Sequence, residues 1–135
     1  MIAKNKKQNN ELTKNKKMHQ FYFEKLDVWQ NARVLVKDMY RVTASFPSEE
    51  VFGITSQIRR ATMSISANIA EGISRTTNKE KSRFLNMSFS SAMEVVNFLI
   101  LSLDLEYLNN EQYTELREQL EKITNQLQAL SRRLV

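Results

Sequence analysis

The sequence predicts an all-α protein, an antiparallel up-down-up-down four-helix bundle of one domain. The chain has 135 residues, which is enough to bury one hydrophobic core. Gly occurs twice and Pro once, while 41% of the residues are apolar, a composition typical of long helices joined by short loops. Apolar residues also recur at steps of three and four in four successive segments, as they do along one face of a helix. Four such helices with short connections pack antiparallel.

A basic arm of residues 1–20 is expected to be disordered in front of a bundle domain of residues 21–135. Six of the twenty basic residues and one of the fifteen acidic residues lie in the arm, which leaves fourteen of each in the domain. The arm therefore carries the whole formal charge of +5. Such an arm is either a solubilising tail or a phosphate-binding segment, in which Lys14, Lys16 and Lys17 would contact the ligand.

The first two helices are predicted over residues 27–45 and 49–71. The first has an apolar seam of Val28, Ala32, Leu35, Met39, Val42 and Phe46, and Pro47 ends it. The second has a stripe of Ile54, Ile58, Ala61, Ile65 and Ile69, and Gly72 is expected to cap it. Its remaining positions are mostly short and uncharged, so we expect it to pack on two sides, in its own bundle and against another surface.

The third and fourth helices are predicted over residues 78–108 and from Asn109–Asn110 onward. Thr77 and Glu80 fit a capping box at the start of the third helix. Apolar residues cover most of its circumference, which favours contact with a neighbouring subunit. The fourth helix repeats Tyr113, Leu116, Leu120, Ile123, Leu127, Leu130 and Leu134. We predict a homo-oligomer with interface residues Thr55, Thr62, Ser66, Phe89, Val95 and Phe98.

The folded part is neutral in sum but unevenly charged. Residues 53–93 contain six basic and two acidic residues, whereas residues 94–131 contain two basic and seven acidic ones. This asymmetry can steer a polyanion to one end of the molecule or bring unlike ends of subunits together. The candidate nucleic-acid-binding residues are Arg75, Lys79, Lys81 and Arg83, with Arg59 and Arg60 as weaker candidates. The alternative is that these side chains pair with acids of an adjacent helix or subunit.

The sequence gives little support for catalysis. It has no Cys, so disulfides and thiolate metal sites are excluded, as suits a reducing cytoplasm. The single His19 lies in the arm, and no Gly-rich phosphate loop or His-Glu metal pair is present. The longest apolar block, residues 95–105, is far shorter than the ~20 residues that span a bilayer, and the N-terminus lacks the apolar run of a signal peptide. We expect a cytoplasmic, non-enzymatic protein without metal or cofactor.

Several stretches resemble a known family. FGITSQIRRA at residues 52–61, SISANIAEG at residues 64–72, Arg75 with Lys79, and Phe84-Leu85 are similar to the bacterial four-helix-bundle proteins encoded within 23S rRNA intervening sequences. The segment Phe23-x-x-Leu26-x-Val28-Trp29-Gln30-x-Ala32 also resembles their opening helix. The resemblance covers roughly residues 21–108, and the fourth helix matches only in character.

The resemblance implies a small four-helix bundle that forms homopentamers. Its fold is similar to the accessory protein of diversity-generating retroelements, which binds nucleic acid and a reverse transcriptase. Two departures stand out: Ser66 where relatives often have Pro, and Ser90 where they often have Gly. The leading functional hypothesis is an oligomer that binds RNA or other nucleic acid. The alternative is a protein-binding accessory module, for example for a reverse transcriptase.

Overall fold

The computed structural model describes residues 18–134, so the predictions for Lys14, Lys16, Lys17 and the rest of the basic arm lie outside it. Two short 3₁₀ turns and four α-helices make up the described chain. Their bounds are η1 Tyr22–Lys25, α2 Asp27–Thr43, η2 Ser48–Glu50, α3 Ile54–Ile73, α4 Asn78–Asp104 and α5 Asn110–Arg133.

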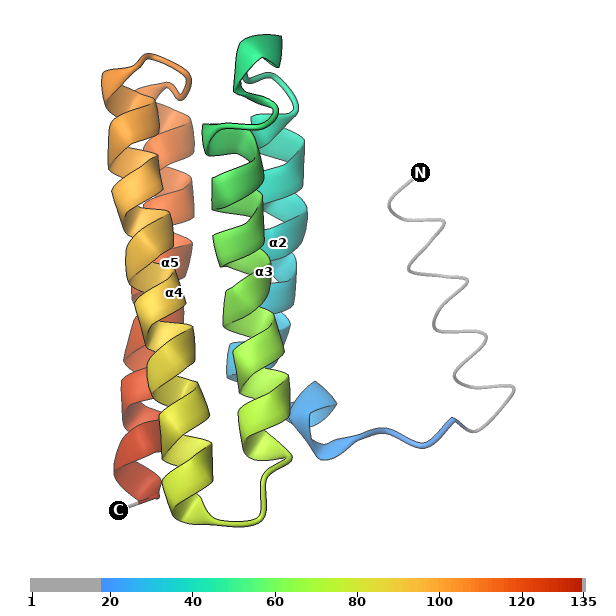
Figure 1. The fold of residues 1–135 in the computed structure, drawn as a ribbon. Coiled ribbons are helices and arrows are strands. Elements are labelled where there is room, and N and C mark those ends of the chain that lie inside the picture. The colour runs from blue at the N-terminus through green and yellow to red at the C-terminus, as the bar shows by residue number, and fades with distance from the viewer. Residues whose placement is uncertain (1–17, 135) are drawn as a thin grey trace.

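The four α-helices pack side by side in a bundle, which confirms the predicted all-α fold class. Each helix contacts the next along the chain, and α5 closes the bundle against α2. Figure 1 shows the chain alternating direction from one helix to the next. The α3–α4 connection, the start of α2 and the end of α5 lie at the lower end, and the other two connections lie at the upper end.

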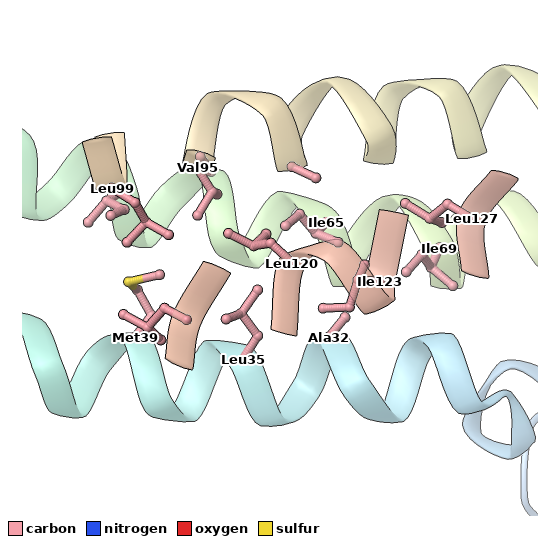
Figure 2. Close-up of a cluster of buried hydrophobic side chains, with 14 of the residues drawn as sticks. Ala32, Leu35, Met39, Ile65, Ile69, Val95, Leu99, Leu120, Ile123 and Leu127 are labelled. Atoms are coloured by element: carbon pink, nitrogen blue, oxygen red, sulfur yellow. The ribbon is translucent and has the colours of Figure 1, made fainter. Parts of the chain in front are cut away.

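The core is one continuous cluster of aliphatic side chains along the bundle axis (Figure 2). Each helix contributes residues at the predicted spacing, and their side chains are almost completely excluded from solvent. Fully buried examples are Leu35 and Met39 of α2, Ile65 and Ile69 of α3, Val95 and Leu99 of α4, and Leu120, Ile123 and Leu127 of α5. Burial of such side chains from all four helices is the main favourable term in folding.

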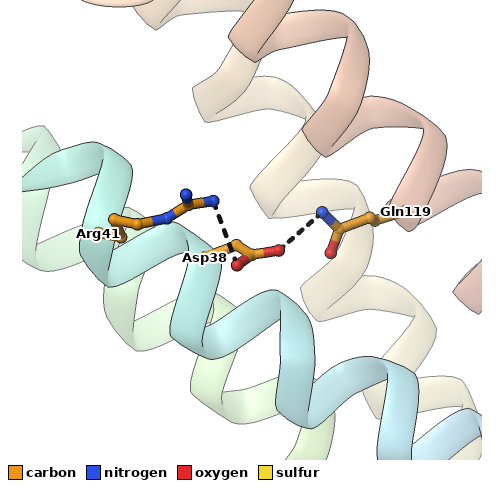
Figure 3. A network of polar contacts seen from close by, with 3 residues as sticks. All are labelled: Asp38, Arg41 and Gln119. Carbon is orange, nitrogen blue, oxygen red and sulfur yellow. Dashed lines mark hydrogen bonds and ion pairs between the residues drawn. The ribbon is translucent and has the colours of Figure 1, made fainter. Parts of the chain in front are cut away.

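Side-chain hydrogen bonds close the seam between α2 and α5. The Gln119 amide nitrogen donates to Asp38 at 3.1 Å, and the same carboxylate pairs with Arg41 at 3.4 Å (Figure 3). About two helical turns away, toward the lower end, the Asn31 amide donates to the Gln126 side chain at 2.8 Å. These bonds fix the register of the first and last helices, which have no direct connection along the chain.

Small side chains let α3 and α4 approach closely, and this pair has the most extensive contact in the bundle. The Ser88 hydroxyl donates to the Ile65 carbonyl at 2.9 Å, and the Ser64 and Ser91 hydroxyls lie 2.9 Å apart. The short residues of α3 were predicted to face another surface. Some of them, such as Ser64, contact α4 of the same chain instead.

Several predicted element boundaries are wrong. Glu49 and Glu50 belong to the separate η2 turn, and α3 begins four to five residues later, at Ile54. Gly72 lies inside the last turn of α3, where Ser74 is the C-cap, and no glycine of the described chain has positive φ. Thr77 does cap α4 by accepting the Glu80 amide hydrogen at 3.2 Å. The reciprocal bond is absent, because the Glu80 carboxylate pairs with Arg83 instead.

Three predicted interface residues lie inside their own bundle. Thr55, Thr62 and Val95 are 5%, 0% and 0% exposed, so they are not available to a neighbouring subunit. The Thr62 hydroxyl donates to the Ile58 carbonyl of its own helix, so a short hydroxyl side chain fits inside the bundle as readily as at an interface. Ser66, Phe89 and Phe98 are half-buried at the edges of the bundle and remain interface candidates.

The bundle leaves part of the apolar surface of α4 in solvent. Five large apolar side chains of this region are 40–54% exposed: Met87, Met93, Ile100, Leu101 and Leu105. By length and composition α4 also meets the criteria for a membrane-crossing helix, with a mean hydropathy of 1.4 in its most apolar window. Here it packs as one of the four bundle helices, in contact with α3 and α5.

Candidate nucleic-acid interface

The predicted basic cluster gathers at the lower end of the bundle, which we call the basic end. Arg75 lies in the connection after α3, and Lys79, Lys81 and Arg83 lie in the first two turns of α4. Arg75, Lys79 and Arg83 are exposed, whereas Lys81 is half-buried. The α3–α4 connection and the first two turns of α4 thus carry four cationic side chains.

A buried aromatic ring orders two of these cations. The guanidinium carbons of Arg75 and Arg83 lie 4.5 and 4.9 Å from the ring centroid of Phe84, within the range of cation–π attraction. Phe84 itself is only 6% exposed. It reaches this position because Gly72 has no side chain: a Cβ on Gly72 would lie 2.6 Å from the Phe84 Cβ. Gly72 therefore admits the Phe84 ring, and both guanidinium groups pack against that ring.

The ion pairs within residues 18–134 leave most of this cluster without an acidic partner. They join Arg41 to Asp38, Arg83 to Glu80 and Arg117 to Glu121, each within one helix. None of these pairs uses Arg75, Lys79 or Lys81. The alternative that an adjacent helix of the same chain neutralises the cluster therefore has no support in the described residues.

Arg59 and Arg60 lie far from the basic end. They occupy the second turn of α3, about 20 Å from its lower terminus at 1.5 Å per residue. Arg59 is occupied inside the subunit: Nε donates to the Thr43 hydroxyl at 2.8 Å, and Nη2 donates to the Tyr40 carbonyl at 3.3 Å. Its guanidinium also lies 4.5 Å from the Tyr40 ring centroid. Arg60 is exposed and isolated from the other candidates.

Two further cations belong to the basic end and were not among the candidates. Arg132 and Arg133 lie in the last turn of α5, which ends beside the start of α4 (Figure 1). Both are exposed. The antiparallel topology predicted from sequence already implies that the fourth helix returns to this end, so that signal was available.

Acidic residues outnumber basic ones at the upper end, where Arg41, Arg59, Arg60 and Arg117 also lie. Glu49 and Glu50 lie in η2, Asp104 ends α4, Glu106 follows it, and Glu111 and Glu115 lie in the first two turns of α5. The uneven charge along the sequence thus becomes a charge separation along the bundle axis. A polyanion approaching such a molecule is attracted to the basic end and repelled from the other.

The model of the 23S rRNA-intervening sequence protein family matches residues 24–129. The chain belongs to this family. The match includes all four helices except the last turn of α5, so the family covers the bundle and leaves out the basic arm. It confirms the family that the sequence resembles and extends the resemblance through most of the fourth helix.

A solved structure supports the fold independently. The bundle is similar to the crystal structure of a protein with unknown function from the S23 ribosomal protein family of Bacteroides thetaiotaomicron VPI-5482. The TM-score is 0.70 at 23% sequence identity, over 77% of this chain and 97% of that one. No curated protein matches the sequence.

Proposed function

We propose that this member of the family is a non-enzymatic homo-oligomer that binds RNA or another nucleic acid through its basic end. The observation that carries the proposal is the pair of guanidinium groups ordered on Phe84, beside Lys79 and without acidic partners other than Glu80. Planar guanidinium groups match phosphate oxygens in geometry, and ordering them beforehand lowers the entropy lost on binding. The N-terminus of α4 adds a favourable dipole at the same place.

The oligomer half of the proposal rests on the apolar surface that the bundle leaves uncovered. Isolated exposed apolar side chains are normal on a monomer, but the five on and just after α4 follow one helix. Contact with other copies would remove them from water. The homopentamer of related proteins is the assembly we propose.

Nucleic-acid binding is tested by adding the protein to fluorescently labelled single-stranded RNA and measuring fluorescence anisotropy. Affinity should fall steeply between about 50 and 200 mM salt, because each phosphate contact releases condensed counterions. Lys79→Glu with Arg83→Glu should weaken binding by at least about tenfold and flatten the salt slope by about 1.4, or 0.7 for each lost contact.

The matched control reverses two exposed lysines elsewhere, Lys37→Glu on α2 and Lys122→Glu on α5. This pair changes the net charge by the same amount but leaves the basic end intact. Absence of binding at low salt would contradict the proposal. Equal losses in the two double variants would contradict the assignment to the basic end.

A protein-binding accessory module is the second candidate. The groove between α3 and α4 favours it, because hydroxyl, amide and thioether groups line it: Ser64, Asn68, Met87, Ser90 and Ser91, between Arg83 and Glu94. Such a mixed surface suits a protein partner such as a reverse transcriptase better than a phosphate backbone. Recovery of one protein partner in the presence of nuclease, lost on Ser90→Arg, would favour this function.

A further inference from the structure

The turn between α2 and α3 presents an aromatic side chain to water. Phe52 is 93% exposed and Val51 is 50% exposed. We call residues 48–53 the tip, which belongs to the upper end of the bundle (Figure 1). Its own hydrogen bonds hold it: the Glu50 amide donates to the Pro47 carbonyl and the Gly53 amide to the Glu50 carbonyl, both at 2.9 Å. A large apolar side chain on a pre-ordered turn is the kind of anchor that enters a pocket of a partner.

The charge of the tip restricts what it can enter. Glu49 and Glu50 directly precede Val51 and Phe52, and no basic residue lies between residues 48 and 53. A complementary surface must therefore combine an apolar pocket with a positive rim.

A groove with these properties lies between α4 and α5, toward the basic end. It has a volume of about 370 Å³. Phe89 supplies its accessible apolar surface, above Leu85 and Leu127, which are each 1% exposed. Arg132 supplies a positive charge at its edge, and Asn86, Gln128 and Ser131 complete it. Among residues 18–134, none of those that line the groove is acidic, so the tip meets no like charge from them. Phe89 is also one of the predicted interface residues that remain accessible.

A molecule cannot fill its own groove with its own tip. The tip is at the upper end, and the groove is near the start of α4. From Phe89 to the upper end of α4 at Asp104 the helix rises about 22 Å. The short η2 turn is fixed between α2 and α3 and does not span that distance. The occupant that the chain itself supplies is therefore the tip of another copy.

We propose that the tip of one copy inserts Phe52 into the α4–α5 groove of a second copy, with the exposed Glu49 near the partner's Arg132. The two contacting surfaces differ, so each copy offers one tip and one groove, and repetition of the contact gives a closed ring or an open chain. The inference rests on the homo-oligomer of the proposed function and does not depend on nucleic-acid binding.

The natural absence of cysteine allows a direct test in the full-length chain. Val51→Cys and Gln128→Cys are prepared as separate variants, mixed and oxidised mildly. A disulfide forms only when the two Cα atoms come within about 7 Å, so a cross-linked pair is expected between these variants. Val51→Cys mixed with Lys37→Cys, an equally accessible position on α2, should give no comparable product.

Phe52→Ser should raise the dissociation constant of the assembly at least about tenfold, since a central aromatic anchor carries much of an interface. Val34→Ser is the control, because Val34 on α2 is another exposed apolar side chain, at 51%. A monomeric wild-type chain at micromolar concentration would contradict both the oligomer and the docking contact. An unchanged assembly of Phe52→Ser would overturn only the docking contact, and loss of assembly without the Val51–Gln128 cross-link would overturn the groove as its partner.

Discussion

Gly72 shows how one missing side chain places two functional groups. A helical glycine is usually unfavourable, by about 1 kcal/mol relative to alanine. Here the position faces Phe84 so closely that any side chain would overlap it. The glycine is therefore required by the approach of α4 to α3, and the position of the Phe84 ring, with Arg75 and Arg83 over it, follows from that approach.

Gly72→Ala is expected to lower the free energy of unfolding by about 1–3 kcal/mol, because the new methyl group overpacks the contact with Phe84. Urea unfolding followed by circular dichroism measures it, with an unchanged m-value. Ser66→Ala in the same helix is the control and should change the stability little, since Ser66 bonds only to the carbonyl of its own helix. A Gly72→Ala variant more stable than the wild type would show that helix propensity outweighs the contact.

Arg59 has a structural task that its neighbour lacks. It ties α3 to the end of α2 through Thr43 and Tyr40, whereas Arg60 is exposed. Arg59→Ala should lower the free energy of unfolding by about 1–2 kcal/mol, from two lost hydrogen bonds and one cation–π contact.

Arg60→Ala is the matched control and should lie within about 0.5 kcal/mol of the wild type. Chemical denaturation measures stability, and RNA anisotropy on the same samples measures binding. A larger loss of RNA affinity for Arg59→Ala than for Lys79→Ala would show that Arg59 contributes to nucleic-acid binding after all.

At the scale of the elements, the start of α5 depends on a complete capping box. The Asn109 side chain accepts the Gln112 amide hydrogen at 2.7 Å, and the Gln112 side chain accepts the Asn109 amide hydrogen at 3.1 Å. α5 is polar outside its single apolar seam and has four buried residues. Capping of its ends therefore contributes a larger share of its stability. The equivalent box on α4 is only half formed.

Asn109→Ala is therefore expected to destabilise the bundle by about 1 kcal/mol, with a range of about 0.5–2. Asn125→Ala, at an exposed position inside the same helix, should have little effect and serves as the control. Thermal unfolding by circular dichroism compares the two. Equal melting temperatures for both variants would mean that water replaces the cap without loss.

At the scale of the whole molecule, basic and acidic residues are unevenly distributed along the bundle axis. Cations of the α3–α4 connection and of α5 meet at one end, and acids of η2, α4 and α5 meet at the other. The described chain joins the basic arm at the lower end, through residue 18 and η1 (Figure 1).

Removal of residues 1–17 deletes six lysines and one glutamate and takes the formal charge from +5 to zero. We expect this deletion to weaken RNA binding at low salt by at least about tenfold and to flatten the salt slope. The melting temperature should stay within a few degrees, because the core cluster lies entirely in α2 to α5 and their connections. Unchanged RNA affinity after the deletion would indicate that the arm is a solubilising tail and not a phosphate-binding segment.

Much of the fold could be predicted because helical periodicity is a local property. Leu35 with Met39, Ile65 with Ile69, and Leu120 with Ile123 each repeat at three or four residues, and all of them are in the core. The small residues of α3 were harder to place. Thr62 and Ser64 look alike in sequence, yet one is fully buried and the other lines the α3–α4 groove.

Local residue patterns were enough to predict four helices and the family, because apolar spacing and a long local motif depend only on neighbours along the chain. Three-dimensional packing was needed to show that Arg59 is engaged within the subunit and that Gly72 admits Phe84. These outcomes depend on which residues from distant segments meet, and that is set by helix direction and approach distance rather than by residue type.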